Sequence, residues 1–191
     1  MQQGGSQLYL SVRLFWILDL LTMDMSDEKL RRIAFHEAGH AWMMVFEGLG
    51  VRSVSLEIRG PVHGDNRGET VPEVQMSEGR RDLSEKFARA ALAGSAAEHF
   101  LMGGWDEESL LADSYDRGRA KGFMAVSGND WKPEALDHYI QALANSVVEE
   151  ISTPRTWHAI TCLAFRLMAK GAITGVEIAA FIEENWEFYS S

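Results

Sequence analysis

Two histidines stand four residues apart in the stretch IAFHEAGHAW (33–42), which otherwise has the character of an apolar, proline-free helix. On a helix with 3.6 residues per turn, His36 and His40 lie on one face about one turn apart. Burying neutral imidazoles and the carboxylate of Glu37 without partners would cost several kcal/mol. Any fold of this chain must therefore either place a metal ion at the pair or satisfy both histidines within a core.

The order of residue types, H-E-x-x-H, is typical of a catalytic zinc site, and a chain of this composition contains it by chance only about 0.02 times. Zinc accepts neutral histidine nitrogen, so both imidazoles can bind one ion. Glu37 directly follows the first histidine and therefore points to the flank of the pair, beside a metal-bound water. There a carboxylate can take a proton from the water and pass it to a leaving amine. The pattern predicts hydrolysis of peptide bonds.

A third protein ligand must come from elsewhere, because a catalytic zinc usually has three. Asp113 and Asp116 are candidates, since they stand three residues apart in an acidic helical segment. Glu98 and His99, in the segment before it, are also candidates. Spacing alone does not choose among the four residues.

The first part of the chain is predicted to form one long helix and a small β region. The helix is expected from about residue 26 to the glycines at 48 and 50. Apolar and polar residues alternate over 51–59, which predicts a half-buried strand. A Gly/Pro-rich loop over 59–69 is expected to lead to a second strand over 70–76, which Pro72 limits to a short or edge strand.

From residue 82 onward the sequence predicts helices. The segment 83–103 has an apolar stripe and an Ala/Gly-rich centre that would let another helix approach closely. Gly39 indicates the same kind of close backbone approach beside the histidines, because glycine inside a helix costs about 1 kcal/mol relative to alanine. Further helices are expected over 106–125, over 132–151, after Thr153-Pro154, and after a capping box formed by Thr174 and Glu177. The predicted fold class is mainly α (α+β), with a small β-hairpin or sheet near the N-terminal third.

Charge and cysteine content narrow the functional classes. The formal net charge of −10 argues against nucleic acid as a partner, because proteins that bind phosphate backbones usually carry a basic surface. The single cysteine, Cys162, excludes an intramolecular disulfide and suits a reducing compartment. A cytoplasmic location is therefore expected, and any zinc ligands would be histidines and carboxylates.

Residues 1–25 form an apolar N-terminal segment whose status the sequence leaves open. Its run LYLSVRLFWILDLL (8–21) is shorter than the roughly 20 apolar residues of a spanning helix and contains Arg13 and Asp19, so no membrane span is expected. The preceding MQQGGSQ has no positive charge, which weakens a signal-peptide interpretation. The alternatives are a helix packed on the domain or on an oligomer partner, a surface membrane contact, and a start site placed too far upstream.

Three stretches occur in order along the chain: FHEAGHA (35–41), ALAGSAAEHFLMGG (91–104) and LLADSYDRGRAKGFM (110–124). Together they resemble the peptidase domain of the FtsH-type AAA zinc metalloproteases. The resemblance covers about residues 26–191, with the last helices similar in layout more than in motif. It implies a zincin-type helical peptidase domain over that range.

The resemblance also implies a set of site residues. Its metal ligands fall on His36, His40 and Asp113, around a Zn²⁺ ion, and its general base and acid falls on Glu37. The aspartate of the family usually follows an asparagine, whereas here Ala112 precedes Asp113. Asp116, one turn further on, therefore stays open as an alternative third ligand.

The chain departs from the full-length family pattern because it contains no G-x-x-x-x-G-K-[ST] nucleotide-binding loop. It resembles a free-standing peptidase domain without an ATPase module. Such a domain could cleave unfolded or short polypeptides without ATP, or depend on a separate AAA unfoldase, and the resemblance makes a homo-oligomeric ring plausible. An extended substrate could add as a strand beside 51–59 or 70–76.

Two other functional classes stay open. The chain could be a non-catalytic binding or assembly module of the same fold with a structural metal, or another metal-dependent amide hydrolase. Glu37 favours an enzyme, because a structural metal site needs no general base.

Overall fold

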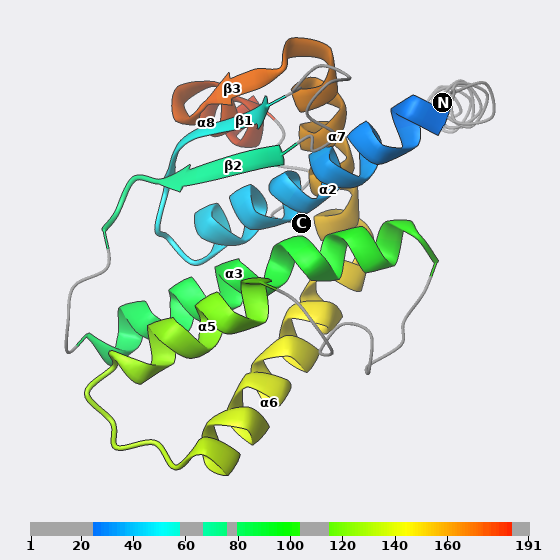
Figure 1. Cartoon of the computed structure of the whole chain (residues 1–191). Helices are drawn as coiled ribbons and strands as arrows, with labels where there is room; N and C mark the ends of the chain where they lie inside the picture. The colour runs from blue at the N-terminus through cyan, green and yellow to red at the C-terminus, as the bar shows by residue number, and fades with distance from the viewer. Residues whose placement is uncertain (1–24, 58–66, 76–79, 104–114, 185–191) are drawn as a thin grey trace, which may run out of the picture.

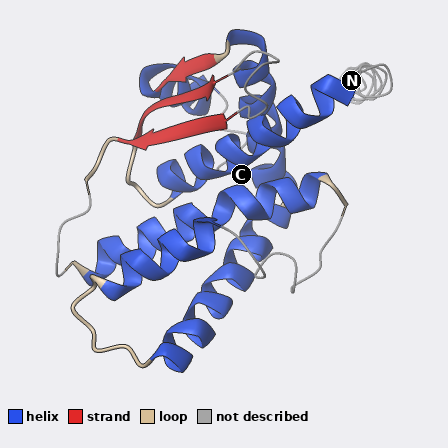
Figure 2. Cartoon of the chain, in the orientation of Figure 1, coloured by secondary structure: helices blue, strands red, loops and turns tan. Residues whose placement is uncertain are grey.

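The computed structural model describes residues 25–57, 67–75, 80–103 and 115–184. This part of the chain is mainly helical and contains one small antiparallel sheet, which confirms the predicted fold class; Figure 2 shows how far helices predominate. In chain order the elements are α2 (Met25–Phe46), β1 (Val51–Glu57), β2 (Arg67–Pro72), α3 (Arg81–Leu101), α5 (Tyr115–Ala125), α6 (Pro133–Ser152), α7 (Pro154–Lys170), β3 (Ala172–Thr174) and α8 (Gly175–Glu184).

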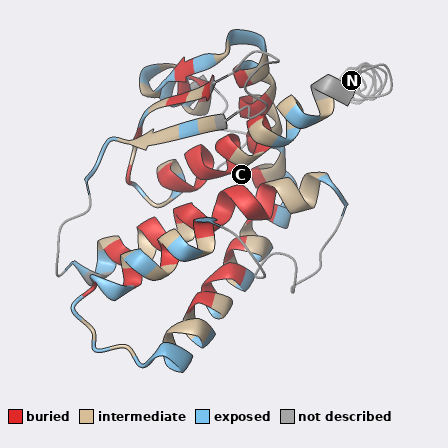
Figure 3. Cartoon of the chain, viewed as in Figure 1, coloured by how far each residue is buried: buried red, intermediate tan, exposed pale blue. Residues whose placement is uncertain are grey.

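Helices α2 and α3 lie side by side at the centre of the fold, between the sheet and helices α5 and α6 (Figure 1). Their close approach depends on Gly39, where a Cβ atom would lie 2.5 Å from the carbonyl oxygen of Ala93 and 2.8 Å from the Cβ of Ala97. Buried residues concentrate along both helices (Figure 3). The close backbone approach predicted at Gly39 is thus confirmed.

The sheet has the strand order β2-β1-β3, and β1 pairs antiparallel with both neighbours. On β1, Val54 and Leu56 are buried, as the alternation predicted. Strand β2 is a short edge strand, as predicted, but it covers Arg67–Pro72 and not 70–76, so it begins within the segment expected to be a loop and stops at the proline. Gly68 explains the difference, because a Cβ there would collide with a side chain of α2, so this glycine serves a close approach and not a turn.

The third strand, β3, was not predicted. Its three residues are too few to show an alternating pattern, and it pairs with β1 through Ser53 opposite Thr174 and Ser55 opposite Ala172. The capping box that follows is confirmed. The backbone N–H of Thr174 donates to Oε2 of Glu177 at 2.8 Å, and the N–H of Glu177 donates to Oγ1 of Thr174 at 3.3 Å.

The remaining predicted helices are present in the described part of the chain. Helices α6 and α7 begin at Pro133 and Pro154, and the Thr153 hydroxyl accepts a 3.3 Å hydrogen bond from the N–H of Thr156. Helix α5 is described from Tyr115, so the predicted helical residues before it lie outside the described residues. The N-terminal segment 1–24 also lies outside them. Among the helices that are described, none combines the length and the apolar character that a membrane crossing requires.

Candidate metal centre

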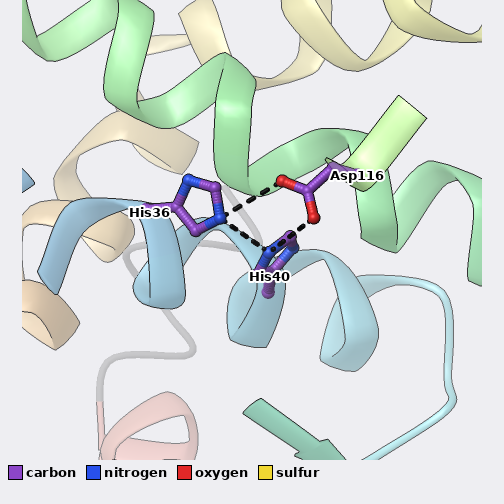
Figure 4. Close-up of side chains that lie close together, drawn as sticks. All are labelled: His36, His40 and Asp116. Carbon is purple, nitrogen blue, oxygen red and sulfur yellow. Dashed lines mark hydrogen bonds and ion pairs between the residues drawn. The ribbon is translucent and has the colours of Figure 1, made fainter. Parts of the chain in front are cut away.

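Three side chains from two helices converge on one point at the centre of the fold (Figure 4). Helix α2 supplies His36 and His40, whose Nε2 atoms lie 3.1 Å apart. Helix α5 supplies Asp116, whose Oδ2 lies 3.2 Å from Nε2 of His36 and whose Oδ1 lies 3.6 Å from Nε2 of His40. One ligand atom from each residue lies within 4.8 Å of the others, so the three could hold a metal ion together.

The other ring nitrogen of His40 fixes its orientation. Nδ1 lies 2.8 Å from the carbonyl oxygen of Ala90, which can only accept a hydrogen bond. The proton of neutral His40 is therefore on Nδ1, and the lone pair of Nε2 points to the centre. Metal-binding histidines typically donate from the second nitrogen in this way.

His36 is oriented by a carboxylate. Its Nδ1 lies 3.2 Å from Oε2 of Glu98, and Oε1 of Glu98 in turn accepts a 2.9 Å hydrogen bond from Nε of Arg32. Glu98, a candidate for the third ligand, thus contacts the ring nitrogen of His36 that points away from Asp116. The arrangement leaves Nε2 of His36 to face the centre.

Asp116 lies in the first turn of α5 and is itself buried, with 4% of its surface exposed. The hydroxyl of Ser95 on α3 donates a 2.9 Å hydrogen bond to its Oδ2. Of the two aspartates that the sequence offered, Asp116 is brought beside the histidine pair. Asp113 lies outside the described residues, so its assignment as third ligand stays a prediction.

The charges of the three groups depend on one another. Burial lowers the pKa of His36, but hydrogen bonds with Asp116 and Glu98 outweigh that effect and raise it to about 10. Burial and the neighbouring charge of His36 lower the pKa of His40. Burial raises the pKa of Asp116, but the hydrogen bond from His36 and the nearby histidine charges outweigh it and hold the pKa at about 2. The cluster therefore balances the Asp116 carboxylate with one positive charge at the centre.

The donor set fits a metal ion. Two imidazole nitrogens and one carboxylate oxygen are ligands that zinc and similar transition ions accept. Space at the centre is kept by Gly94 of α3, where a Cβ atom would lie 2.4 Å from Nε2 of His40 and 2.9 Å from Nε2 of His36. A residue with a side chain at this position would fill the place where the three ligand atoms meet.

Glu37 lies beside the centre and does not belong to the ligand group. It is buried, with 6% of its surface exposed, and its charge acts on both histidines. The hydroxyl of Thr70 on β2 donates a 2.7 Å hydrogen bond to its Oε2. Gly68, also on β2, leaves room for the Glu37 side chain, because a Cβ there would lie 2.2 Å from Cγ of Glu37. The sheet therefore holds this carboxylate in place.

A cavity of about 190 Å³ adjoins the centre. His40 forms part of its wall, and Thr70 and Pro72 of the edge strand β2 form another part. The same cavity thus reaches a candidate metal ligand, the residue that holds Glu37, and a strand edge.

The positions of the supporting residues could not be found from the sequence. Ser95, Thr70 and the carbonyl group of Ala90 belong to no spacing pattern with the histidines, and only the packing of α3 and β2 against α2 brings them there. Glu98 was a candidate for the third ligand because it lies on the helix that precedes the two aspartates, but its side chain contacts Nδ1 of His36. No family model matches the chain, and a search of curated proteins finds no match to it.

Proposed function

We propose that this chain is a zinc-dependent metallopeptidase, with His36, His40 and Asp116 as metal ligands and Glu37 as general base. The observation that carries the proposal is the convergence of three lone-pair atoms whose orientations are set by separate partners. When His36 is neutral, these three atoms are all hydrogen-bond acceptors, and they repel one another unless a cation lies among them; a metal ion would take the place of the proton that His36 carries in metal-free protein.

Zinc is the metal that this ligand set suits best. Three protein ligands of the histidine and carboxylate type leave a fourth position open, as in catalytic zinc sites, whereas structural sites usually have four protein ligands. When bound, the ion lowers the pKa of a water molecule to about 7 and polarises the carbonyl group of a substrate.

Glu37 then has the role of moving a proton. Thr70 donates to Oε2 of Glu37, so Oε1 is left to accept a proton from the attacking water. The same carboxylate returns that proton to the nitrogen of the leaving amine as the C–N bond breaks. Amide and water are thereby converted to carboxylic acid and amine with no net change in the enzyme.

The substrate is proposed to be an extended polypeptide that binds along β2. This strand lies at the edge of the sheet, and Thr70 and Pro72 on it line the cavity beside His40. A peptide that pairs with an edge strand gains backbone hydrogen bonds and is held straight, which would bring one of its carbonyl groups to the metal.

The resemblance to the FtsH-type peptidase domain supports the same function. The proposed function includes cleavage of polypeptides without ATP by this chain itself, with a separate AAA unfoldase as a partner where substrates are folded. A metal-dependent hydrolase of another amide would use the same ligands and base, so the substrate has to be tested directly.

The deciding experiment compares the wild-type protein with Glu37→Gln on an unfolded casein substrate, after zinc content has been measured in both. We expect one zinc per chain in each protein and at least a 100-fold lower rate in the variant, because the amide cannot accept the proton. Glu134→Gln, in the exposed first turn of α6, is the matched control and should cleave like the wild type.

Three results would contradict the peptidase proposal or redirect it. Zinc in the wild type without any Glu37-dependent cleavage of casein or of a peptide panel would favour a binding module with a structural metal. Cleavage of small amides but not of peptides would indicate a different amide hydrolase. Absence of bound metal would contradict the peptidase, the binding module with a structural metal and the metal-dependent amide hydrolase alike.

A further inference from the structure

Arg119 stands out among the cationic residues of α5. Two other cations of this helix, Arg117 and Lys121, form ion pairs with Asp137 of α6. Arg119 forms no hydrogen bond or ion pair with another described residue, and its guanidinium carbon lies 5.9 Å from the ring centres of both Tyr115 and Phe123. A guanidinium held between two rings keeps its N–H donors available, because the ring faces offer no hydrogen-bond acceptor of comparable strength.

The place of Arg119 links it to the candidate metal centre. Arg119 follows Asp116 by three residues, so both lie on the same side of α5. Arg119 and His40 line the same cavity, and Met44, Phe87 and Phe123 form apolar parts of its wall. The cavity therefore combines an apolar lining with one strong cation, and none of the described residues that line it is acidic.

The size of the cavity limits what it can hold. Its volume of about 190 Å³ is below the roughly 300–1,000 Å³ of pockets for drug-sized ligands, so it suits a single residue of a peptide. The net charge of −10 gives the molecule no general attraction for anions. Binding of an anion in this cavity would therefore depend on Arg119 itself.

We infer that this cavity binds one apolar residue of the substrate and that Arg119 pairs with a substrate carboxylate beside it. The inference rests on the proposed function for the identity of the ligand as a peptide. Arginine binds carboxylates through two parallel N–H···O bonds, which gives both affinity and a fixed orientation. The carboxylate is either the C-terminal group of the bound residue or the side chain of a neighbouring Asp or Glu.

The test measures binding to zinc-loaded Glu37→Gln protein by calorimetry, so that no ligand is cleaved. The probes are acetyl-Gly-Phe as the free acid, acetyl-Gly-Phe amide, and acetyl-Gly-Phe-Asp amide, which carries only a side-chain carboxylate. Binding of each probe is then measured to the double variant that carries Arg119→Gln together with Glu37→Gln. Arg166→Gln is the matched control, because the Arg166 guanidinium also lies over a ring, 4.6 Å from the centre of Phe181 on α8.

We expect at least one carboxylate probe to bind about 10-fold or more tightly than the amide. That advantage should fall to nearly onefold with Arg119→Gln and persist with Arg166→Gln, with zinc content and melting temperature unchanged. A preference for the free acid identifies a terminal carboxylate, and a preference for the Asp probe identifies a side chain.

The inference is overturned if all probes bind equally, if none binds, or if the carboxylate advantage survives Arg119→Gln, since the metal would then hold the carboxylate. These outcomes are separate from those of the casein experiment. An Arg119-dependent advantage without hydrolysis by the wild type would support the cavity's role and remove the peptidase proposal.

Discussion

The hydroxyl of Thr70 lies 2.7 Å from Oε2 of Glu37, so an edge strand holds a carboxylate of the central helix. Replacing Thr70 by Val removes the hydrogen bond and keeps the shape of the side chain. We expect kcat for peptide cleavage to fall about 10-fold, because an unoriented base transfers protons less efficiently, with zinc content unchanged. Thr161→Val is the control, since that hydroxyl donates to the carbonyl of Trp157 within α7, away from the candidate site. Equal kcat in the wild type and Thr70→Val would show that the hydrogen bond from Thr70 to Glu37 does not contribute to catalysis.

Gly94 keeps open the point where the ligand atoms meet. Gly94→Ala would place a Cβ 2.4 Å from Nε2 of His40, so the imidazole must move. We expect zinc affinity to fall by at least about 10-fold in competition with a chelator, while circular dichroism stays helical. Gly122→Ala on α5, where a Cβ meets nothing within 4 Å, should leave affinity unchanged. Wild-type affinity in Gly94→Ala would place the metal elsewhere.

Glu98 accepts the Nδ1 proton of His36 and is itself paired with Arg32. In Glu98→Gln the charged acceptor is lost, so His36 becomes a weaker and less oriented ligand. Outer partners of this kind are worth about 10- to 100-fold in metal affinity, and we expect a loss in that range. The control is Glu47→Gln, which breaks the ion pair between Glu47, just after the end of α2, and Arg89 of α3. It should change zinc affinity less than twofold. A similar loss in both variants would indicate general destabilisation.

Zinc binding should release a proton over a wide pH range. The pKa of His36 is raised from its ordinary value of 6.5 to about 10, so metal-free protein carries the proton on this residue at pH 7. The pKa of His40 is lowered, so this residue is already neutral at pH 7 and zinc binding releases no second proton from it. We therefore expect zinc affinity to rise about 10-fold per pH unit between pH 7 and 8.5. An affinity independent of pH in this interval would show that His36 is already neutral there.

The same shift has a defined sign for the stability of the metal-free protein. A raised pKa in the folded state stabilises the fold fully below pH 6.5, and the stabilisation is lost as the pH rises toward about 10. The melting temperature of metal-free protein should fall over this interval, and that of zinc-loaded protein should fall less, because the metal replaces the proton.

Local patterns in the sequence predicted most of the helices correctly. Long periodic stretches, prolines at helix starts and the capping box of Thr174 and Glu177 act within a few residues, so they can be recognised without a structure. Strand β3 has only three residues and depends on its pairing with β1, which no local pattern records. Gly68 was assigned to a loop because its role, making room for Glu37, exists only when β2 lies against α2.

The sequence likewise predicted one part of the candidate site and left another part open. His36, Glu37 and His40 share one helix, so helical geometry places them correctly from the sequence alone. The third residue comes from another helix, and the spacing of Asp113 and Asp116 could not decide which of them faces the pair. The packing of α5 against α3, with Ser95 donating to Asp116, supplies the information that spacing lacks.

The most direct test of the metal site is the zinc content of purified protein in the wild type, Asp116→Asn, Asp113→Asn and the control Asp137→Asn, whose carboxylate pairs with Lys121 on the surface. Each protein is dialysed against the same weak chelator, and metal is counted by mass spectrometry. The proposed ligand set predicts one zinc per chain in the wild type, Asp113→Asn and Asp137→Asn, and at least about 100-fold weaker binding in Asp116→Asn. Wild-type protein without zinc, or Asp116→Asn that retains it as the wild type does, would contradict the account.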